Sequence, residues 1–158
     1  MWKQIFKTTL IAGALDITAA CTQAWLSKGI TPDRVLKYLA SGIFGKDAGA
    51  GGTGMILFGL LVHFIIAFAC TAIYFILYPK IKLLHKNICL SALFIAVIAW
   101  AVTTRVIIPL SKANPQPFDL IKALMAMAIL FVCIGLPISY FAKHYYSKGK
   151  QTFNSLYY

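Results

Sequence analysis

Long apolar runs separated by short polar segments make up this chain. Four runs reach the roughly 20 mainly apolar residues that a helix needs to cross the hydrocarbon core of a bilayer. They extend from Ile5 to Leu26, from Gly54 to Tyr78, from Ile88 to Leu110 and from Leu120 to Phe141. The pattern predicts an all-α membrane protein, one domain over residues 1–158, with four transmembrane helices in a compact bundle.

A short basic turn joins the second and third predicted spans. It holds Lys80, Lys82 and Lys86 within a few residues, and short loops rich in lysine lie on the cytoplasmic side of a membrane. We therefore expect the N- and C-termini to be cytoplasmic. On this arrangement the basic residues on the opposite, outer side are Lys28, Arg34, Lys37, Lys46, Lys112 and Lys122.

The first span has an alternative interpretation as a cleaved signal peptide. Lys3 and Lys7 precede an apolar run that ends in the small residues Thr18 to Cys21. Asp16 interrupts that run, however, and signal peptides have an uninterrupted apolar region. We expect the first span to be retained as a transmembrane helix.

The segment between the first two spans predicts a short amphipathic helix. Thr31, Pro32 and Asp33 provide an N-cap residue, a proline for the first helical position and an acid for the first turn. Apolar residues then recur at helical spacing as far as Phe44, which is typical of an interfacial helix. Such a helix either covers the mouth of the bundle or serves as a partner-docking or gating element.

Composition supports a membrane location. The chain is 60% hydrophobic and 12% charged, with a formal net charge of +11, whereas soluble domains are about 25% charged. The basic residues punctuate apolar runs and form no continuous basic face, so we expect the lipid bilayer and no nucleic acid as a partner. Bases and aromatic rings alternate in the tail at 142–158, as in an inner-leaflet anchor.

The sequence holds no convincing cofactor or metal motif. Residues 49–54 fit the glycine pattern G-x-G-x-x-G, but no strand precedes them as nucleotide binding requires. We interpret them as a flexible approach to the second span. The four cysteines lack metal-ligand spacing and are interpreted as small apolar residues. No catalytic motif is present, so we expect neither a cofactor nor an enzyme.

Three ionisable residues lie within the predicted spans, where such groups are costly and often functional. They are Asp16, His63 and Arg105, all in the outer halves of their spans, and Thr103 and Thr104 adjoin the arginine. We expect these five residues to form a polar cluster. It either fixes helix register through an Asp16–Arg105 ion pair or carries proton- or ion-linked chemistry, because histidine can change its charge near neutral pH.

Several fragments resemble the YagU-like family of small bacterial inner-membrane proteins. The first runs from Leu61 to Phe68, the second is Tyr78-Pro79-Lys80-Ile81-Lys82-Leu83, and Pro117-Phe118-Asp119-Leu120 follows later. The resemblance implies a multi-pass protein of the bacterial cytoplasmic membrane and highlights His63, Pro79 and Asp119. It provides no catalytic residues.

Two functions follow from these features. The first is a proton- or ion-linked, or acid-responsive, membrane protein acting through the polar cluster. The second is a non-catalytic accessory or scaffold protein that binds another membrane protein through faces of small residues such as Ala12, Gly13 and Ala20. Four spans enclose little space, so the first function favours a homo-oligomer.

Overall fold

The computed structural model describes residues 1–112 and 119–157, and the described residues are helical throughout apart from short turns. Four helices are long and apolar enough to cross a membrane. The candidate spans are α1 (Trp2–Lys28), α4 (Thr53–Leu77), and the stretches Ile88–Ile107 and Leu120–Ser147 of two longer helices. The predicted all-α four-helix architecture of a multi-pass membrane protein is confirmed.

The third and fourth long helices each contain a π-helical segment. The third consists of α6 (Ile88–Val102), η1 (Thr103–Ile107) and α7 (Ile108–Leu110). The fourth consists of α8 (Leu120–Leu130), η2 (Phe131–Gly135) and α9 (Leu136–Tyr157). Gly135 ends η2, and Pro137 follows it after one residue. The helix also continues well beyond Phe141, where the apolar run ends.

Three short helices connect the long ones. They are α2 (Pro32–Phe44), α3 (Asp47–Ala50) and α5 (Lys82–Lys86). The amphipathic helix therefore has the predicted bounds, and the glycine-rich segment leads into α4 as expected. No strand precedes that segment in the part of the chain that is described.

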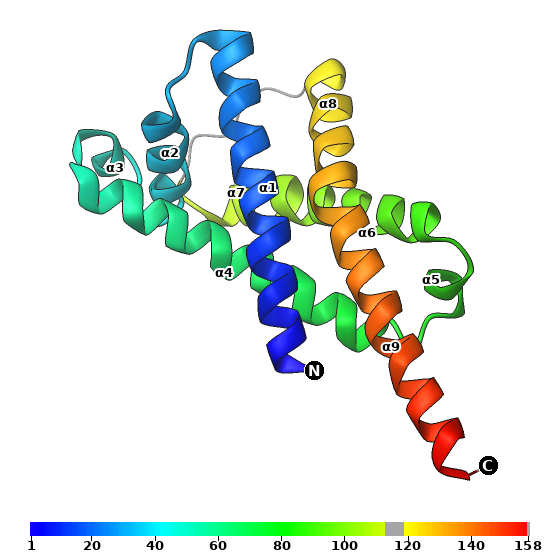
Figure 1. The fold of residues 1–158 in the computed structure, drawn as a ribbon. Coiled ribbons are helices and arrows are strands. Elements are labelled where there is room, and N and C mark those ends of the chain that lie inside the picture. Colours follow the sequence, from blue (N-terminus) through cyan, green and yellow to red (C-terminus); the bar gives the residue numbers. More distant parts are fainter. Residues whose placement is uncertain (113–118, 158) are drawn as a thin grey trace.

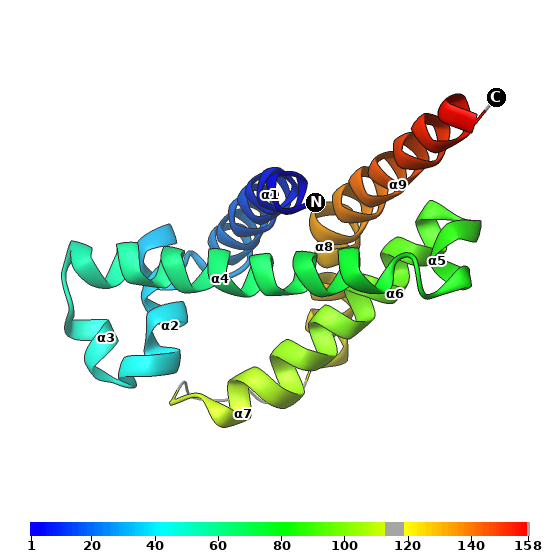
Figure 2. The same ribbon diagram turned by 90° about the horizontal axis from the view of Figure 1, so that it is seen from below.

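The long helices are arranged in two crossing pairs. Helix α1 and the α8–α9 helix run in opposite directions across α4 and α6 (Figure 1). Helices α4 and α6 meet near α5 and then spread apart, so that α2 and α3 lie beside the open end of α4 (Figure 2). The molecule is consequently tighter at the end that holds α5 and the N-terminus of α1.

The core lies at this tighter end. Ile5 of α1, Phe75 of α4 and Ile138 of α9 are fully buried there. The Tyr74 hydroxyl hydrogen-bonds the hydroxyl of Ser91 on α6 and donates to Ser139 Oγ on α9 at 3.2 Å. One tyrosine thus joins three of the four long helices.

Large apolar side chains cover the outer surface of the bundle. Leu26, Leu57 and Ile121 are exposed by 79%, 63% and 70%. Soluble monomers rarely expose so many large apolar side chains together. Contact with lipid hydrocarbon tails avoids the free-energy cost of exposing these side chains to water.

Tyr145 and Tyr146 of the basic, aromatic tail pack inward. The Tyr146 hydroxyl donates to the Phe75 carbonyl oxygen at 2.7 Å, and its ring stacks on Tyr78. The structure describes no side chain beyond Ser147. The start of the tail therefore packs against the core. It is also the start of the segment that the sequence predicts to be an inner-leaflet anchor.

Candidate functional site

Asp16 and His63 lie on the packed faces of α1 and α4, where the two helices cross. Close approach at this crossing depends on Gly13 of α1, because a Cβ atom there would be 2.8 Å from Phe64 Cε1. Ala12 and Ala67 are buried at the same crossing. The small-residue face predicted for the first span therefore contacts a helix, and Asp16 belongs to that face.

The His63 ring is held by the main chain of α1. Its Nε2 lies 3.0 Å from the Gly13 carbonyl oxygen. A carbonyl oxygen only accepts hydrogen bonds, so Nε2 carries the hydrogen and donates it. Nδ1 is therefore the unprotonated nitrogen of the neutral ring.

The half-buried Asp16 carboxyl is the centre of a small polar group. It interacts electrostatically with His63 and with the thiols of Cys70 on α4 and Cys133 on η2. Asp16 and His63 are not within ion-pair distance, since the described residues contain a single ion pair, elsewhere. The group draws side chains from three of the four long helices.

Arg105, Thr103 and Thr104 do not join this group, and the predicted five-residue cluster is corrected accordingly. No ion pair links Asp16 to Arg105 among the described residues, and Arg105 is exposed. Thr104 Oγ1 donates to the Trp100 carbonyl oxygen at 2.7 Å within its own helix. All three belong to η1, at the end of the third helix that diverges from α4 (Figure 2).

Two hydroxyls that the sequence analysis did not single out lie on α1, toward its N-terminus from Asp16. The Oγ1 atoms of Thr8 and Thr9 are buried and have no hydrogen-bond partner among the described residues. Thr9 precedes Asp16 by seven residues and therefore lies on the same face, about 10 Å along the helix. The seven-residue spacing between Thr9 and Asp16 is the signal in the sequence that could have indicated Thr9.

Pro79 and Asp119 lie outside the Asp16 group. Pro79 is in the turn between α4 and α5. Asp119 caps α8, its Oδ1 accepting from the backbone N–H of Ile121 and Lys122 at 3.0 and 3.2 Å. Asp119 therefore has a structural role at a helix end. Positions 117 and 118, which belong to the same fragment that resembles the YagU-like family, lie outside the described residues.

Neither metal ligands nor disulfides mark the site. The described residues hold no group of three or more His, Cys or acidic side chains that could bind a metal ion, and Cys21, Cys70, Cys89 and Cys133 are free thiols. What the Asp16 group can do chemically is accept, hold and release protons.

Two hollows lie on the surface of the bundle, and only the first reaches this group. One is an apolar groove of about 800 Å³ between α1 and α8, which reaches Cys133. The other is a basic pocket of about 620 Å³ on α2 and α3.

Comparison of the chain with protein-family models, with curated proteins and with solved structures finds no match. The resemblance to the YagU-like family stays a prediction.

Proposed function

We propose that this chain is a proton-linked membrane protein in which Asp16 and His63 carry the proton. The observation that carries the proposal is the Gly13 contact, which assigns the donor to Nε2 of His63 and leaves Nδ1 available for proton exchange, in a ring that interacts electrostatically with Asp16. Ionisable residues that face one another within membrane-spanning helices are a recurrent feature of proton relays.

The proposed proton transfer runs from His63 to Asp16 in two steps. A proton taken up on Nδ1 makes His63 an imidazolium, which the Asp16 carboxylate stabilises. Transfer of that proton to an Asp16 oxygen, through a water molecule between the two groups, returns the ring to its neutral Nε2–H form. Both side chains are half-buried, and the proposal requires that water reaches them from inside the bundle.

The buried hydroxyls of Thr8 and Thr9 extend the polar path toward the tighter end of the bundle. A buried hydroxyl with no partner costs about 1–3 kcal/mol, which a hydrogen-bonded water would offset. Tyr74 follows at that end, where its hydroxyl is hydrogen-bonded to the hydroxyls of Ser91 and Ser139. The proposed path therefore follows the interior of the bundle between α1, α4 and α9.

The proposed setting is the bacterial inner membrane, with both termini in the cytoplasm. The lysine-rich turn that contains α5 supports this orientation. The start of α1 and the described part of α9 lie at the same end of the bundle as α5 (Figure 1).

A flux measurement in proteoliposomes tests the function. An imposed pH gradient should collapse faster with the wild type than in empty liposomes. Asp16→Asn and His63→Gln should reduce the rate to that of empty liposomes, because neither amide exchanges protons. Glutamine retains an N–H that can donate to Gly13, so the second variant removes titration while keeping the contact.

Matched controls are available in the same chain. Asp47→Asn on α3 and His85→Gln on α5 change the same residue types away from the site and should keep wild-type flux. A wild type no faster than empty liposomes would contradict the proposal. So would wild-type flux from folded His63→Gln.

A second candidate function is that of an accessory protein that binds another membrane protein. The apolar groove between α1 and α8 supports it, since most of its lining is apolar or small and a second transmembrane helix could pack there. This function predicts that one membrane protein co-purifies with the wild type and is lost on Ala19→Trp, which fills the groove. Purification of a lone species from gentle detergent would contradict it.

A further inference from the structure

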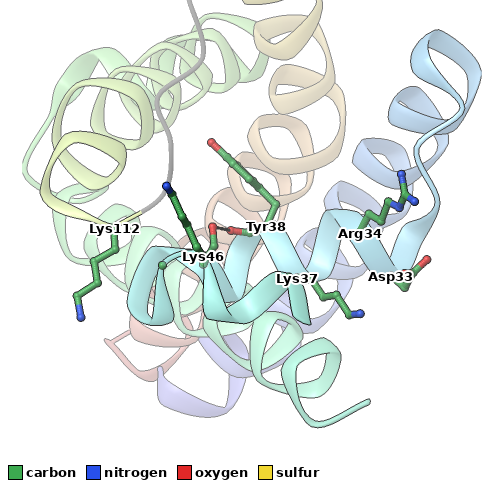
Figure 3. Close-up of a pocket in the computed structure, with 9 residues that line it drawn as sticks. Asp33, Arg34, Lys37, Tyr38, Lys46 and Lys112 are labelled. Carbon is green, nitrogen blue, oxygen red and sulfur yellow. Dashed lines mark hydrogen bonds between the residues drawn. The ribbon is translucent and has the colours of Figure 1, made fainter. Parts of the chain in front are cut away.

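The basic pocket gathers four of the six cations predicted for the outer side of the membrane. Its lining includes Arg34 and Lys37 of α2, Lys46 before α3, and Lys112 in the turn after α7. Figure 3 shows Arg34 and Lys37 toward the start of α2, with Lys46 and Lys112 near its end. The cations thus come from segments well separated in the sequence.

Main-chain contacts assemble this pocket. The Lys112 N–H donates to the Gly42 carbonyl oxygen at 2.9 Å and joins its turn to α2. Gly45 ends α2 with φ at +64°, a conformation that favours glycine, and a Cβ atom there would lie 3.5 Å from Lys112 Cβ. The position of Lys112 beside α2 is therefore fixed by the backbone.

The pocket has an excess of positive charge. Asp33 is the one acid in its lining, and the pKa of that carboxyl is lowered chiefly by a hydrogen bond from the Thr31 side chain, with a smaller contribution from Lys37. The one ion pair among the described residues, Lys122–Asp119, lies elsewhere. Four cations around one carboxylate are incompletely neutralised by the protein itself.

We propose that this pocket binds a phosphate-bearing anion. Phosphate oxygens accept hydrogen bonds from guanidinium and ammonium groups, and arginine can bind them in a bidentate manner. The Tyr38 and Ser41 side chains also line the pocket, and its volume lies within the range for small-molecule sites. The pocket adjoins the end of a membrane-spanning helix, so the anion is either the headgroup of an acidic phospholipid or a soluble phosphate ester.

This inference also explains an unfavourable feature of the sequence. Lysine and arginine on the outer side oppose the positive-inside rule, yet six lie on the side predicted to be outer. A bound anion would compensate the charge of those that line the pocket. The proposal is independent of Asp16 and His63, which lie outside this lining.

Two binding measurements on the detergent-purified full chain test the pocket. Native mass spectrometry compares phosphatidylglycerol with zwitterionic phosphatidylcholine, and titration calorimetry measures glycerol 1-phosphate and inorganic phosphate. Each cation near an acidic lipid surface contributes about fivefold in affinity. Lys46→Gln/Lys112→Gln should therefore weaken binding by about 25-fold, whereas Lys3→Gln/Lys7→Gln, at the other end of α1, should leave it unchanged.

The two ligand sources give different results. Binding of phosphatidylglycerol alone, lost in the pocket variant, assigns the site to a lipid headgroup. Binding of glycerol 1-phosphate or inorganic phosphate with the same loss assigns it to a soluble anion. Equal affinity in the pocket and control variants, or no binding of any of the anionic probes by the wild type, would overturn the proposal. Thermal unfolding of each variant establishes that it is folded.

Discussion

Single residues without bulky side chains decide how closely the helices of this protein approach one another. Gly59 of α4 lies against the Leu36 main chain of α2, and Gly135 of η2 lies against the Ala92 main chain of α6. A β-carbon at either position would clash with backbone atoms, which cannot move aside as the end of a flexible side chain can. The first contact determines how closely α2 packs against α4, and the second determines how closely η2 packs against α6.

Gly59→Ala should destabilise the protein by about 1–3 kcal/mol, the usual cost of overpacking. The matched control is Gly54→Ala in the same helix, where a Cβ atom meets nothing within 4 Å. Thermal unfolding in detergent should show a lower midpoint for the first variant and no loss for the second. Equal midpoints would show that α2 is not held by this contact.

The sequence predicted the position of Asp16 correctly but not that of Arg105. The small residues Ala12 and Ala20 lie four residues before and after Asp16 and therefore place it on the face that packs, because spacing along one helix fixes direction around its axis. Depth in the membrane suggested that Arg105 also joins Asp16. Depth, however, carries no information about lateral distance between helices, and no ion pair joins these residues in the described part of the chain.

At the scale of elements, helix ends and helix junctions give the bundle its order. The bounds of the four apolar runs followed from length and hydropathy to within a few residues, apart from the extension of α9. The π-helical segments did not, since their sequences carry no signal that separates them from α-helix. They arise where packing against neighbours shifts the hydrogen-bond ladder.

The cap of α8 predicts a pH dependence. The hydrogen bond and ion pair with Lys122 hold the pKa of Asp119 below its usual range. The folded state therefore favours the carboxylate, whose stabilisation is present at neutral pH and is lost as pH falls through this lowered pKa. Asp119→Ala should unfold at a lower temperature than wild type at pH 7, and the difference should shrink in acid.

Asp119→Asn provides the control for that experiment. Asparagine can still cap a helix but carries no charge, so its stability should lie between those of wild type and the alanine variant. A difference between wild type and Asp119→Ala that is the same at pH 7 and at pH 3 would contradict the assignment of the effect to the carboxylate.

Tyr74 makes the junction between α4, α6 and α9, and Tyr74→Phe tests that junction. The change leaves the hydroxyls of Ser91 and Ser139 buried without their partner, which should cost about 1–3 kcal/mol. Tyr140→Phe is the matched control, since Tyr140 is 56% exposed. Detergent unfolding curves should separate the two variants, and coincident curves would rule out a stabilising role for the hydroxyl.

At the scale of the whole molecule, the bundle is tight at one end and open at the other. The tight end holds the core, α5 and the start of α1, while the open end holds α2, α3 and the basic pocket (Figure 1). This asymmetry could not be predicted from the sequence, because the length and hydropathy of a span do not determine the angle at which it crosses its neighbours. It results from the wide crossing of the two helix pairs.

Orientation in the membrane can be measured directly. We expect a membrane-impermeant thiol reagent to label Lys46→Cys in intact cells, and to label Lys86→Cys or Lys143→Cys only after the cells are opened. The four native cysteines are first replaced by alanine. Equal labelling of Lys46→Cys and Lys86→Cys in intact cells would contradict a four-span topology, and the reverse pattern would invert it.

The π-helical segment η2 has a consequence for how such a chain can change in length. Each of its turns contains one residue more than an α-helical turn. Deletion of one residue between Phe131 and Gly135 would restore an ordinary turn and leave α8 and α9 facing their present neighbours. The same deletion inside α9 would rotate everything beyond it by about 100° and remove Ser139 from Tyr74. Deletions of one residue in related chains should therefore be tolerated at η2 and selected against elsewhere in this helix.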